Sequence, residues 1–190
     1  MRYKDDDKKE SIIKAAIQLI NEAGLAETSM SKIAKKAGIS PGTIYTYFDN
    51  KDDMLKKLFL ASKKEMQQKV SRGINISLPT EYEFKMMLKN YINFFTNNRD
   101  YFLFLEQYMN SPLILKLCEE EIQMISMPLH EFFENGKKRD VFKQIDIDLM
   151  FIYVFSPLVQ IAKKYFNGEF EFTEQNVEKI IQMSWASIKK

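Results

Sequence analysis

Hydroxyl and ammonium side chains crowd one short segment of the 190-residue chain, residues 40–51. They belong to Ser40, Thr43, Tyr45, Thr46, Tyr47 and Lys51. Such groups donate hydrogen bonds to phosphate oxygens and base edges, which is the chemistry of nucleic-acid recognition. Gly42 lies among them and would let another molecule approach the backbone closely. Each residue alone is compatible with an ordinary turn or surface role, so the indication comes from their combination.

The chain offers little for catalysis or metal binding. A single His and a single Cys provide no His/Cys metal site, no internal disulfide and no Ser/His/Asp or Cys/His/Asn catalytic set. We therefore expect no catalytic residue, no metal and no cofactor. Cys118 is interpreted as a buried apolar residue, with a free redox thiol as the minor alternative. His130 is interpreted as a surface or hydrogen-bonded core residue.

The elements that must position the 40–51 segment are predicted to be helices. With 6 Gly and 5 Pro, the chain has few residues for the turns of an all-β fold. Apolar residues at helical spacing predict a first helix that ends at Gly24: Ile12, Ile13, Ala16, Ile17 and Ile20. A short helix follows from Ser29 to Gly38, and Ser40 before Pro41 begins another over 42–48.

Two short helices separated by a glycine turn have the layout of a helix-turn-helix. Such a unit places the start of its second helix in the major groove of DNA. The first helix carries cations, at Lys32, Lys35 and Lys36. Ile44 and Phe48, four residues apart, are the expected inward anchors. Lys51, at the start of the next helix, is placed to meet a phosphate together with the free N–H groups there.

Residues 10–59 resemble the DNA-binding domain of the TetR family of bacterial transcriptional regulators. The match runs over residues 28–55 and includes Ile33-Ala34, Ala37-Gly38-Ile39-Ser40, Gly42, Ile44-Tyr45, Tyr47-Phe48, Lys51 and Leu55. The resemblance implies base contacts by Pro41, Gly42, Tyr45 and Thr46. It implies phosphate contacts by Thr28 or Ser29 and by Ser40, Thr43, Tyr47 and Lys51. Pro41 replaces the usual basic or large polar residue, which favours van der Waals contact, for instance with a thymine methyl group.

Beyond a linker at 71–80 the chain is again predicted to be helical, over 80–97, 99–109, 111–135, 146–166 and 173–189. The fold class is all-α with about nine helices: an N-terminal three-helix helix-turn-helix domain and a C-terminal helical ligand-binding and dimerisation domain. The expected boundaries are 1–9 for a disordered charged arm or tag remnant, 10–50 for the DNA-binding domain, 51–70 for a connecting helix and 71–190 for the effector-binding and dimerisation domain.

Two uses compete for the aromatic residues of the second region, which holds all but two of the 15 Phe. A stripe on the last two helices indicates a dimer interface: Ile152, Phe155, Val159, Val177, Ile181, Trp185 and Ile188. The resemblance implies that these helices pair in a homodimer, which would read a palindromic site. A second set is a candidate ligand cavity: Tyr91, Phe95, Phe102, Tyr108, Met124, Met127, Met150 and Tyr153. Packing within the protomer is the alternative for every residue of both sets.

Charge and hydropathy complete the prediction. Residues 1–70 carry 14 basic against 10 acidic residues, and residues 71–190 carry 14 against 16, so the front is mildly basic. No apolar run approaches the ~18 residues of a membrane span, and no secretory leader is evident, so a cytoplasmic protein is expected. The predicted function is that of a repressor released from a palindromic DNA operator by a small apolar, aromatic or amphipathic effector. A helix-turn-helix adaptor or assembly module without ligand control is the alternative, and a small enzyme is disfavoured.

Overall fold

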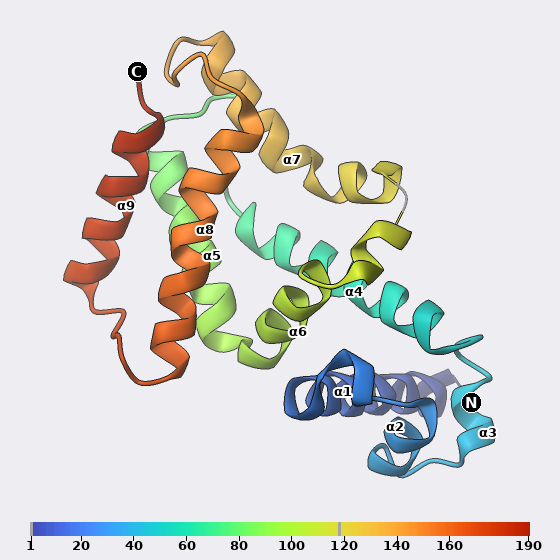
Figure 1. Ribbon diagram of the computed structural model, residues 1–190. Helices are drawn as coiled ribbons and strands as arrows, with labels where there is room; N and C mark the ends of the chain where they lie inside the picture. Colours follow the sequence, from blue (N-terminus) through green and yellow to red (C-terminus); the bar gives the residue numbers. More distant parts are fainter. Residues whose placement is uncertain (1, 118) are drawn as a thin grey trace. The chain divides into compact units, whose positions relative to one another are not determined.

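The computed structural model describes residues 2–117 and 119–190, except for the side chains of residues 2–7, 119, 122, 124 and 125. Cys118 therefore lies outside the described residues. Within them the fold is all-α, as predicted (Figure 1). The helices are α1 Arg2–Glu27, α2 Met30–Lys36, α3 Pro41–Ile44, α4 Lys51–Val70, α5 Glu81–Asn97, α6 Arg99–Met109, the 3₁₀ helix η1 Pro112–Lys116, α7 Glu119–Lys138, α8 Ile147–Phe166 and α9 Glu174–Ile188.

The chain packs as two compact units. Unit 1 comprises Met1–Lys64 and Asn98–Ile122, and unit 2 comprises Glu65–Asn97 and Gln123–Lys190. Helices α4 and α7 each contribute to both units. Unit 1 therefore contains α6, a helix that the sequence prediction had grouped with the effector-binding region. Among the described residues, no helix combines the length and the apolar character needed to cross a membrane.

In unit 1, α1 packs against α2 and α6, and α2 packs against α3. The predicted apolar face of α1 is buried, since Ile12, Ala16, Ile17 and Ile20 are at most 2% exposed. Gly24 interrupts the helix with a φ of 86°, a conformation that favours glycine, so the predicted end at this residue is a real break in helical geometry. At the other end, α1 begins at Arg2, so residues 2–9 are helical instead of forming the expected disordered arm.

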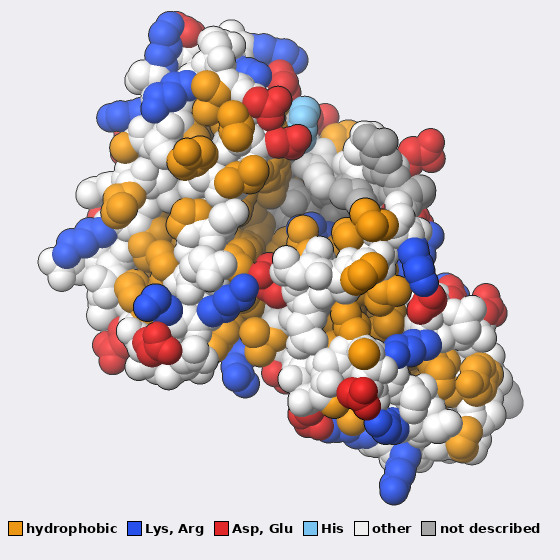
Figure 2. Space-filling view, viewed as in Figure 1, with side chains coloured by type: hydrophobic (Ala, Val, Ile, Leu, Met, Phe, Trp, Pro, Cys, Tyr) orange, Lys and Arg blue, Asp and Glu red, His pale blue; other side chains and the backbone are white. Residues whose placement is uncertain are grey.

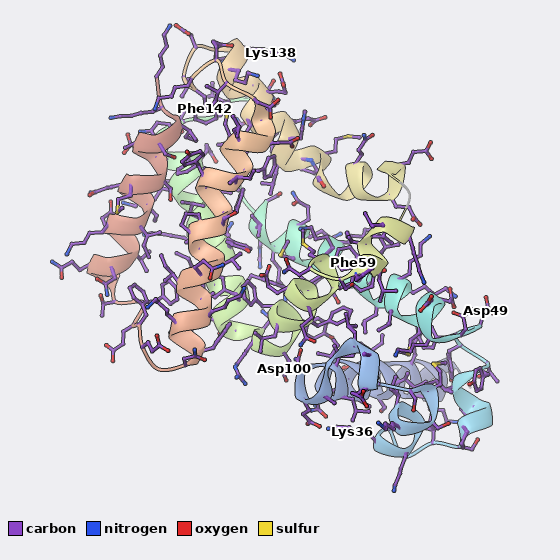
Figure 3. The ribbon with its side chains drawn as sticks, viewed as in Figure 1. Lys36, Asp49, Phe59, Asp100, Lys138 and Phe142 are labelled. Carbon is purple, nitrogen blue, oxygen red and sulfur yellow. The ribbon has the colours of Figure 1, made fainter. Side chains whose placement is uncertain are left out.

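In unit 2, α5, α8 and α9 pack against one another (Figure 1). An aromatic cluster joins them to α7 through Phe142, whose ring centroid lies 5.8 Å from those of Phe132 and Phe133 and 5.7 Å from that of Trp185 (Figure 3). The Phe142 ring also explains why Gly136 lies inside α7, where the sequence predicted a helix end. A Cβ atom at this position would lie 2.0 Å from the ring, so the missing side chain makes room for it.

The predicted helix over 111–135 is wrong in its first part. Ser111 caps the 3₁₀ helix η1, because its Oγ accepts a hydrogen bond from Leu113 N at 3.3 Å, and Pro112 is the first residue of η1. Leu117 is buried and has an extended backbone, with ψ at 142°, which ends η1. Burial of one side chain in an extended conformation divides the segment, and α7 runs from Glu119 to Lys138.

Candidate DNA-binding site

Local hydrogen bonds fix the turn between α2 and α3. Ser29 caps α2 by accepting a hydrogen bond from Lys32 N at 3.3 Å, and Ser40 caps α3 by accepting one from Thr43 N at 3.2 Å. Between the two helices, Gly38 adopts a φ of 70°, which turns the chain at low steric cost. The start of α3 is therefore positioned by residues that are neighbours in the sequence.

Two apolar residues anchor this segment to unit 1. Ile44, at the end of α3, is fully buried, and Phe48 is 4% exposed. Ile33 and Ala34 of α2 are also fully buried. The predicted inward anchors thus lie in the core, and the opposite side of α3 is left for the surface.

The four residues predicted to contact bases are all exposed: Pro41, Gly42, Tyr45 and Thr46. The Tyr45 side chain is 54% exposed, which is unusual for an aromatic residue that serves only packing. Thr46 Oγ1 donates to Thr43 O at 2.7 Å, and the Ser40 and Thr43 hydroxyls lie 2.8 Å apart. The structure brings these side chains together on one polar surface of unit 1.

Gly42 has no steric reason to be glycine inside the protein. A Cβ atom there would meet only Ser40 Oγ, at 3.9 Å, which is ordinary van der Waals distance. The space that the missing side chain leaves therefore faces outward. This fits a position where a phosphate or base edge approaches the backbone.

The residues predicted to contact phosphates do not all share this exposure. Ser29 and Ser40 are exposed, and Thr43 and Tyr47 are half-buried. Thr28 is 2% exposed, and its hydroxyl donates to Gly24 O at 2.9 Å. The Thr28 side chain therefore secures the end of α1 and is closed to a phosphate, which corrects the prediction for this residue.

Two lysines lie against the carboxyl-terminal end of α1. Lys51 Nζ donates to Ala26 O at 3.3 Å, and Lys32 Nζ donates to Glu27 O at 2.8 Å. Cations at this end of a helix interact favourably with its free carbonyl groups. An ammonium group has three donors, so one carbonyl leaves Lys51 able to bind a phosphate as well.

A reciprocal cap fixes the start of α4, where Lys51 stands. Asp53 N donates to Asn50 Oδ1 at 2.9 Å, and Asp49 N donates to Asp53 Oδ2 at 3.1 Å. The Lys57 ammonium, bonded to the same carboxylate at 2.8 Å, lowers the pKa of Asp53. The carboxylate therefore stays ionised and keeps the helix start ordered.

Comparison with known proteins agrees with this geometry. Residues 12–58 match the family model of the bacterial regulatory proteins of the tetR family, and residues 79–189 match that of the tetracyclin repressor-like C-terminal domain. The second match alone covers more than half of the chain. The chain belongs to the TetR family. It is a helix-turn-helix DNA-binding transcriptional regulator, and the family is not one of enzymes.

Relatives of this TetR-family regulator match along its whole length. An uncharacterized HTH-type transcriptional regulator of Haemophilus influenzae is 26% identical over 190 residues, which is 100% of both chains. A putative TetR-family regulator of Vibrio parahaemolyticus has a solved structure with 30% identity and a TM-score of 0.80, covering 96% of this chain and 99% of that one. A TetR-family regulator of Marinobacter aquaeolei has the same fold, with 21% identity, a TM-score of 0.88 and 100% of both chains covered.

The residues predicted for the dimer interface divide by burial. Ile152 is 55% exposed, and Phe155, Val159, Val177 and Trp185 are half-buried. Ile181 and Ile188 are 2% and 0% exposed, so they pack inside the protomer and are closed to a partner, which corrects the prediction for both. On an amphipathic helix, the inward edge of an apolar stripe belongs to the protomer's own core.

On the same two helices, the sequence prediction left out Leu149 and Met183 and assigned Tyr153 to the ligand cavity instead of the interface. Leu149, Tyr153 and Met183 are 47%, 62% and 75% exposed, and hydrophobic side chains gather over α8 on the face shown in Figure 2. Leu149 precedes Ile152 by three residues and Tyr153 by four, so helical spacing places it beside both of them on α8. That spacing was the signal that could have added Leu149 and Tyr153 to the predicted interface.

The residues predicted to line a ligand cavity fall in both units. Phe102 and Tyr108 belong to unit 1, where the Tyr108 ring stacks on that of Phe59 with 4.3 Å between centroids. In unit 2, the Tyr91 ring lies 5.6 Å from that of Phe95, at an edge-to-face angle of 84°. Both pairs are buried, as is Met150, whereas Met127 and Tyr153 are 50% and 62% exposed. The side chain of Met124 lies outside the described residues.

Proposed function

We propose that this TetR-family regulator is a homodimeric repressor in the cytoplasm that binds a palindromic operator and releases it when a small apolar, aromatic or amphipathic effector binds. The observation that carries the DNA-binding part is the exposure of Tyr45 and Gly42 beside the buried anchors Ile44 and Phe48. One side of α3 is thereby fixed and the other is free for base edges. Phosphate contacts by Ser29, Ser40, Thr43, Tyr47 and Lys51 would set the register on the duplex.

Dimerisation is supported by the apolar residues on the surface of α8 and α9. Leu149, Ile152, Tyr153 and Met183 are each 47% to 75% exposed, and apolar groups of this size on neighbouring helices are typical of a buried interface. One recognition helix reads few base pairs, so two-fold symmetry and a palindromic operator increase specificity.

Effector control is proposed to act through the helices of unit 1. Helix α4 runs without interruption from unit 1 into unit 2. Helix α6 is tied to α1, because Asn21 Nδ2 donates to Asp100 O at 2.9 Å, and to α4 through the Phe59–Tyr108 stack. A movement of either helix would therefore reach α1 and residues 40–51, the recognition segment. The effector need only bind the released state more tightly than the operator-bound state.

The experiment that tests the proposal is selection of bound duplexes from random DNA with the purified full chain, followed by footprinting. An enriched inverted repeat is the expected result. Enrichment of no sequence would contradict operator binding. Release should then be measured by adding candidate effectors to the selected complex, and a dimer that no effector displaces would contradict the induction mechanism.

A matched pair of tyrosine variants links this result to α3. Tyr45→Ala should weaken binding to the selected duplex about tenfold or more, since loss of a base contact costs roughly 1–3 kcal/mol. Tyr82→Ala removes a side chain that is 67% exposed in unit 2 and should leave binding unchanged. The adaptor alternative predicts instead that no palindromic site is enriched and that the chain shows no salt-dependent binding to a duplex.

A further inference from the structure

Lys63 is a half-buried cation between two helices of unit 1. It stands on α4, and its Nζ lies 3.9 Å from the Met109 sulfur at the end of α6. Desolvation lowers the pKa of Lys63, and the negative charge of Glu106, also on α6, partly opposes the shift. Among the described residues, no carboxylate oxygen lies within 4.0 Å of the Lys63 Nζ, the longest distance of an ion pair. An ammonium group that has lost part of its hydration is stabilised when it meets an anion.

Ser62, the preceding residue, is a second polar group without a local explanation. Its side chain is 2% exposed, and its Oγ has no hydrogen-bond partner among the described atoms. A helical serine often bonds a carbonyl in the preceding turn, which this one does not do. Most buried hydroxyl groups in folded proteins are satisfied, so an orphaned one indicates a missing partner.

Both polar groups flank one aromatic residue on the inner face of α4. Ser62 and Lys63 follow Phe59 by three and four residues, so each of them neighbours Phe59 on the surface of the helix. The Phe59 ring stacks on the buried Tyr108 of α6, where α4 and α6 cross in Figure 3. Burial raises the pKa of Tyr108, so its phenol remains a neutral donor. The result is an ammonium group and an unpaired hydroxyl group on α4, beside the Phe59 ring and the Met109 thioether.

We propose that Lys63 and Ser62 bind the carboxylate of the effector, and that the effector is an organic monoacid with an apolar or aromatic body. This inference rests on the proposed effector control and names its chemical class. A carboxylate accepts one charge-assisted hydrogen bond from the ammonium and one from the hydroxyl on its two oxygens. A dianionic phosphate would be matched better by several cations, whereas Lys63 is a single cation and Glu106 beside it adds negative charge.

The test compares acids with their neutral counterparts on the purified full chain. Octanoate, dodecanoate and phenylacetate are titrated by calorimetry beside the primary amides of the same acids. At least one acid should bind about tenfold or more tightly than its amide, the ratio that corresponds to one charge-assisted contact. Equal affinity for acid and amide, or no binding of any acid, overturns the proposal.

Variants on α4 assign the effect to the two side chains. Lys63→Met should lower the affinity for the acid about tenfold and leave the affinity for the amide unchanged. Lys63→Arg should retain most of the affinity for the acid, and Ser62→Ala should lower that affinity a few-fold. Lys64→Met removes the same charge from the exposed neighbouring position and serves as the matched control. Circular dichroism and thermal unfolding establish that each variant is folded. Unchanged acid binding by a folded Lys63→Met variant overturns the proposal.

A DNA-binding measurement on the same samples separates this inference from the function on which it rests. If the chain binds its selected duplex and none of the acids binds or displaces it, the carboxylate site is wrong and the regulator function stands. If no duplex is bound specifically while Lys63-dependent acid binding is observed, the proposed operator function is wrong and the carboxylate site stands.

Discussion

The recognition segment of unit 1 and the α8–α9 segment of unit 2 are both proposed to contact partners, but they are built differently. In the recognition segment the stabilising contacts are local. Ser40 caps α3 by accepting a hydrogen bond from Thr43 N, three residues away, and Asn50 caps α4 by accepting one from Asp53 N at the same spacing. In the α8–α9 segment they join distant residues, such as Phe142 with Trp185 and Lys143 N with Ile188 O at 2.8 Å. A locally built surface can be read from a motif, whereas a surface built by distant contacts depends on which helix sides the rest of the unit covers.

The two surfaces also differ in chemistry. The recognition segment exposes hydroxyl and backbone groups around Gly42 and Tyr45, which suit a charged and hydrated polymer. The α8–α9 surface exposes Leu149, Ile152 and Met183, which suit an apolar partner such as a second copy of the chain. Substitutions that disturb one surface should therefore give a different measurable defect from substitutions on the other.

The largest effect is expected at the α8–α9 surface. Ile152→Asp would place a charge in the proposed interface, and because a buried unpaired charge is strongly unfavourable, the dimer should dissociate. Operator affinity should fall more than about a hundredfold, since each half-site then binds singly. Analytical ultracentrifugation and gel shift measure the two changes. Leu115→Asp, at a residue 85% exposed in η1, is the control. An Ile152→Asp protein that still sediments as a dimer would refute this interface.

The next effect concerns the long-range packing of unit 2. Gly136→Ala would drive a Cβ atom to 2.0 Å from the buried Phe142 ring, and overpacking of this kind costs about 1–3 kcal/mol or more of unfolding free energy. Urea unfolding should show the loss. Gly42→Ala adds the same methyl group where only Ser40 Oγ lies near, at 3.9 Å, and should leave the midpoint nearly unchanged. Equal unfolding midpoints for the two variants would contradict close packing of Phe142 against Gly136.

A third prediction uses Gly42→Ala at the recognition surface. Because the added methyl group points away from the protein interior, the stability of the free chain should not change. Operator affinity should fall about tenfold because the methyl group clashes with DNA, a loss similar to that of one base contact. Fluorescence anisotropy with the selected duplex measures the affinity. Wild-type affinity would show that nothing approaches the backbone closely at this position.

The smallest effect is expected for Lys51. Lys51→Ala should weaken operator binding only a few-fold at moderate salt, and it should lower the slope of log affinity against log salt by about one unit, because one phosphate contact is lost. Lys179→Ala, an exposed lysine of α9, removes the same charge and should leave the slope unchanged. A Lys51→Ala slope equal to that of the wild type would argue against a phosphate contact.

Much of the fold could be predicted because its signals are local. The apolar spacing of Ile12 to Ile20, the cap at Ser40 and the stops at Gly24 and Gly38 each depend on residues within two helical turns. The failures have distant causes. Gly136 did not end α7 because Phe142 fills the space above it, and the segment after Asn110 was divided because Leu117 is buried in an extended conformation.

The same division holds for the candidate sites. The sequence by itself determined the all-α class and the helix-turn-helix, and it predicted the candidate DNA contacts around Ser40, Tyr45 and Lys51. It could do so because caps, turns and amphipathic spacing act over a few residues. Only the tertiary structure decided that Thr28, Ile181 and Ile188 are closed to partners, that the Ser62 hydroxyl is buried without a partner among the described atoms, and that Lys63 lies half-buried beside Met109. Burial is a property of what packs against a side chain, and that depends on residues far away in the chain.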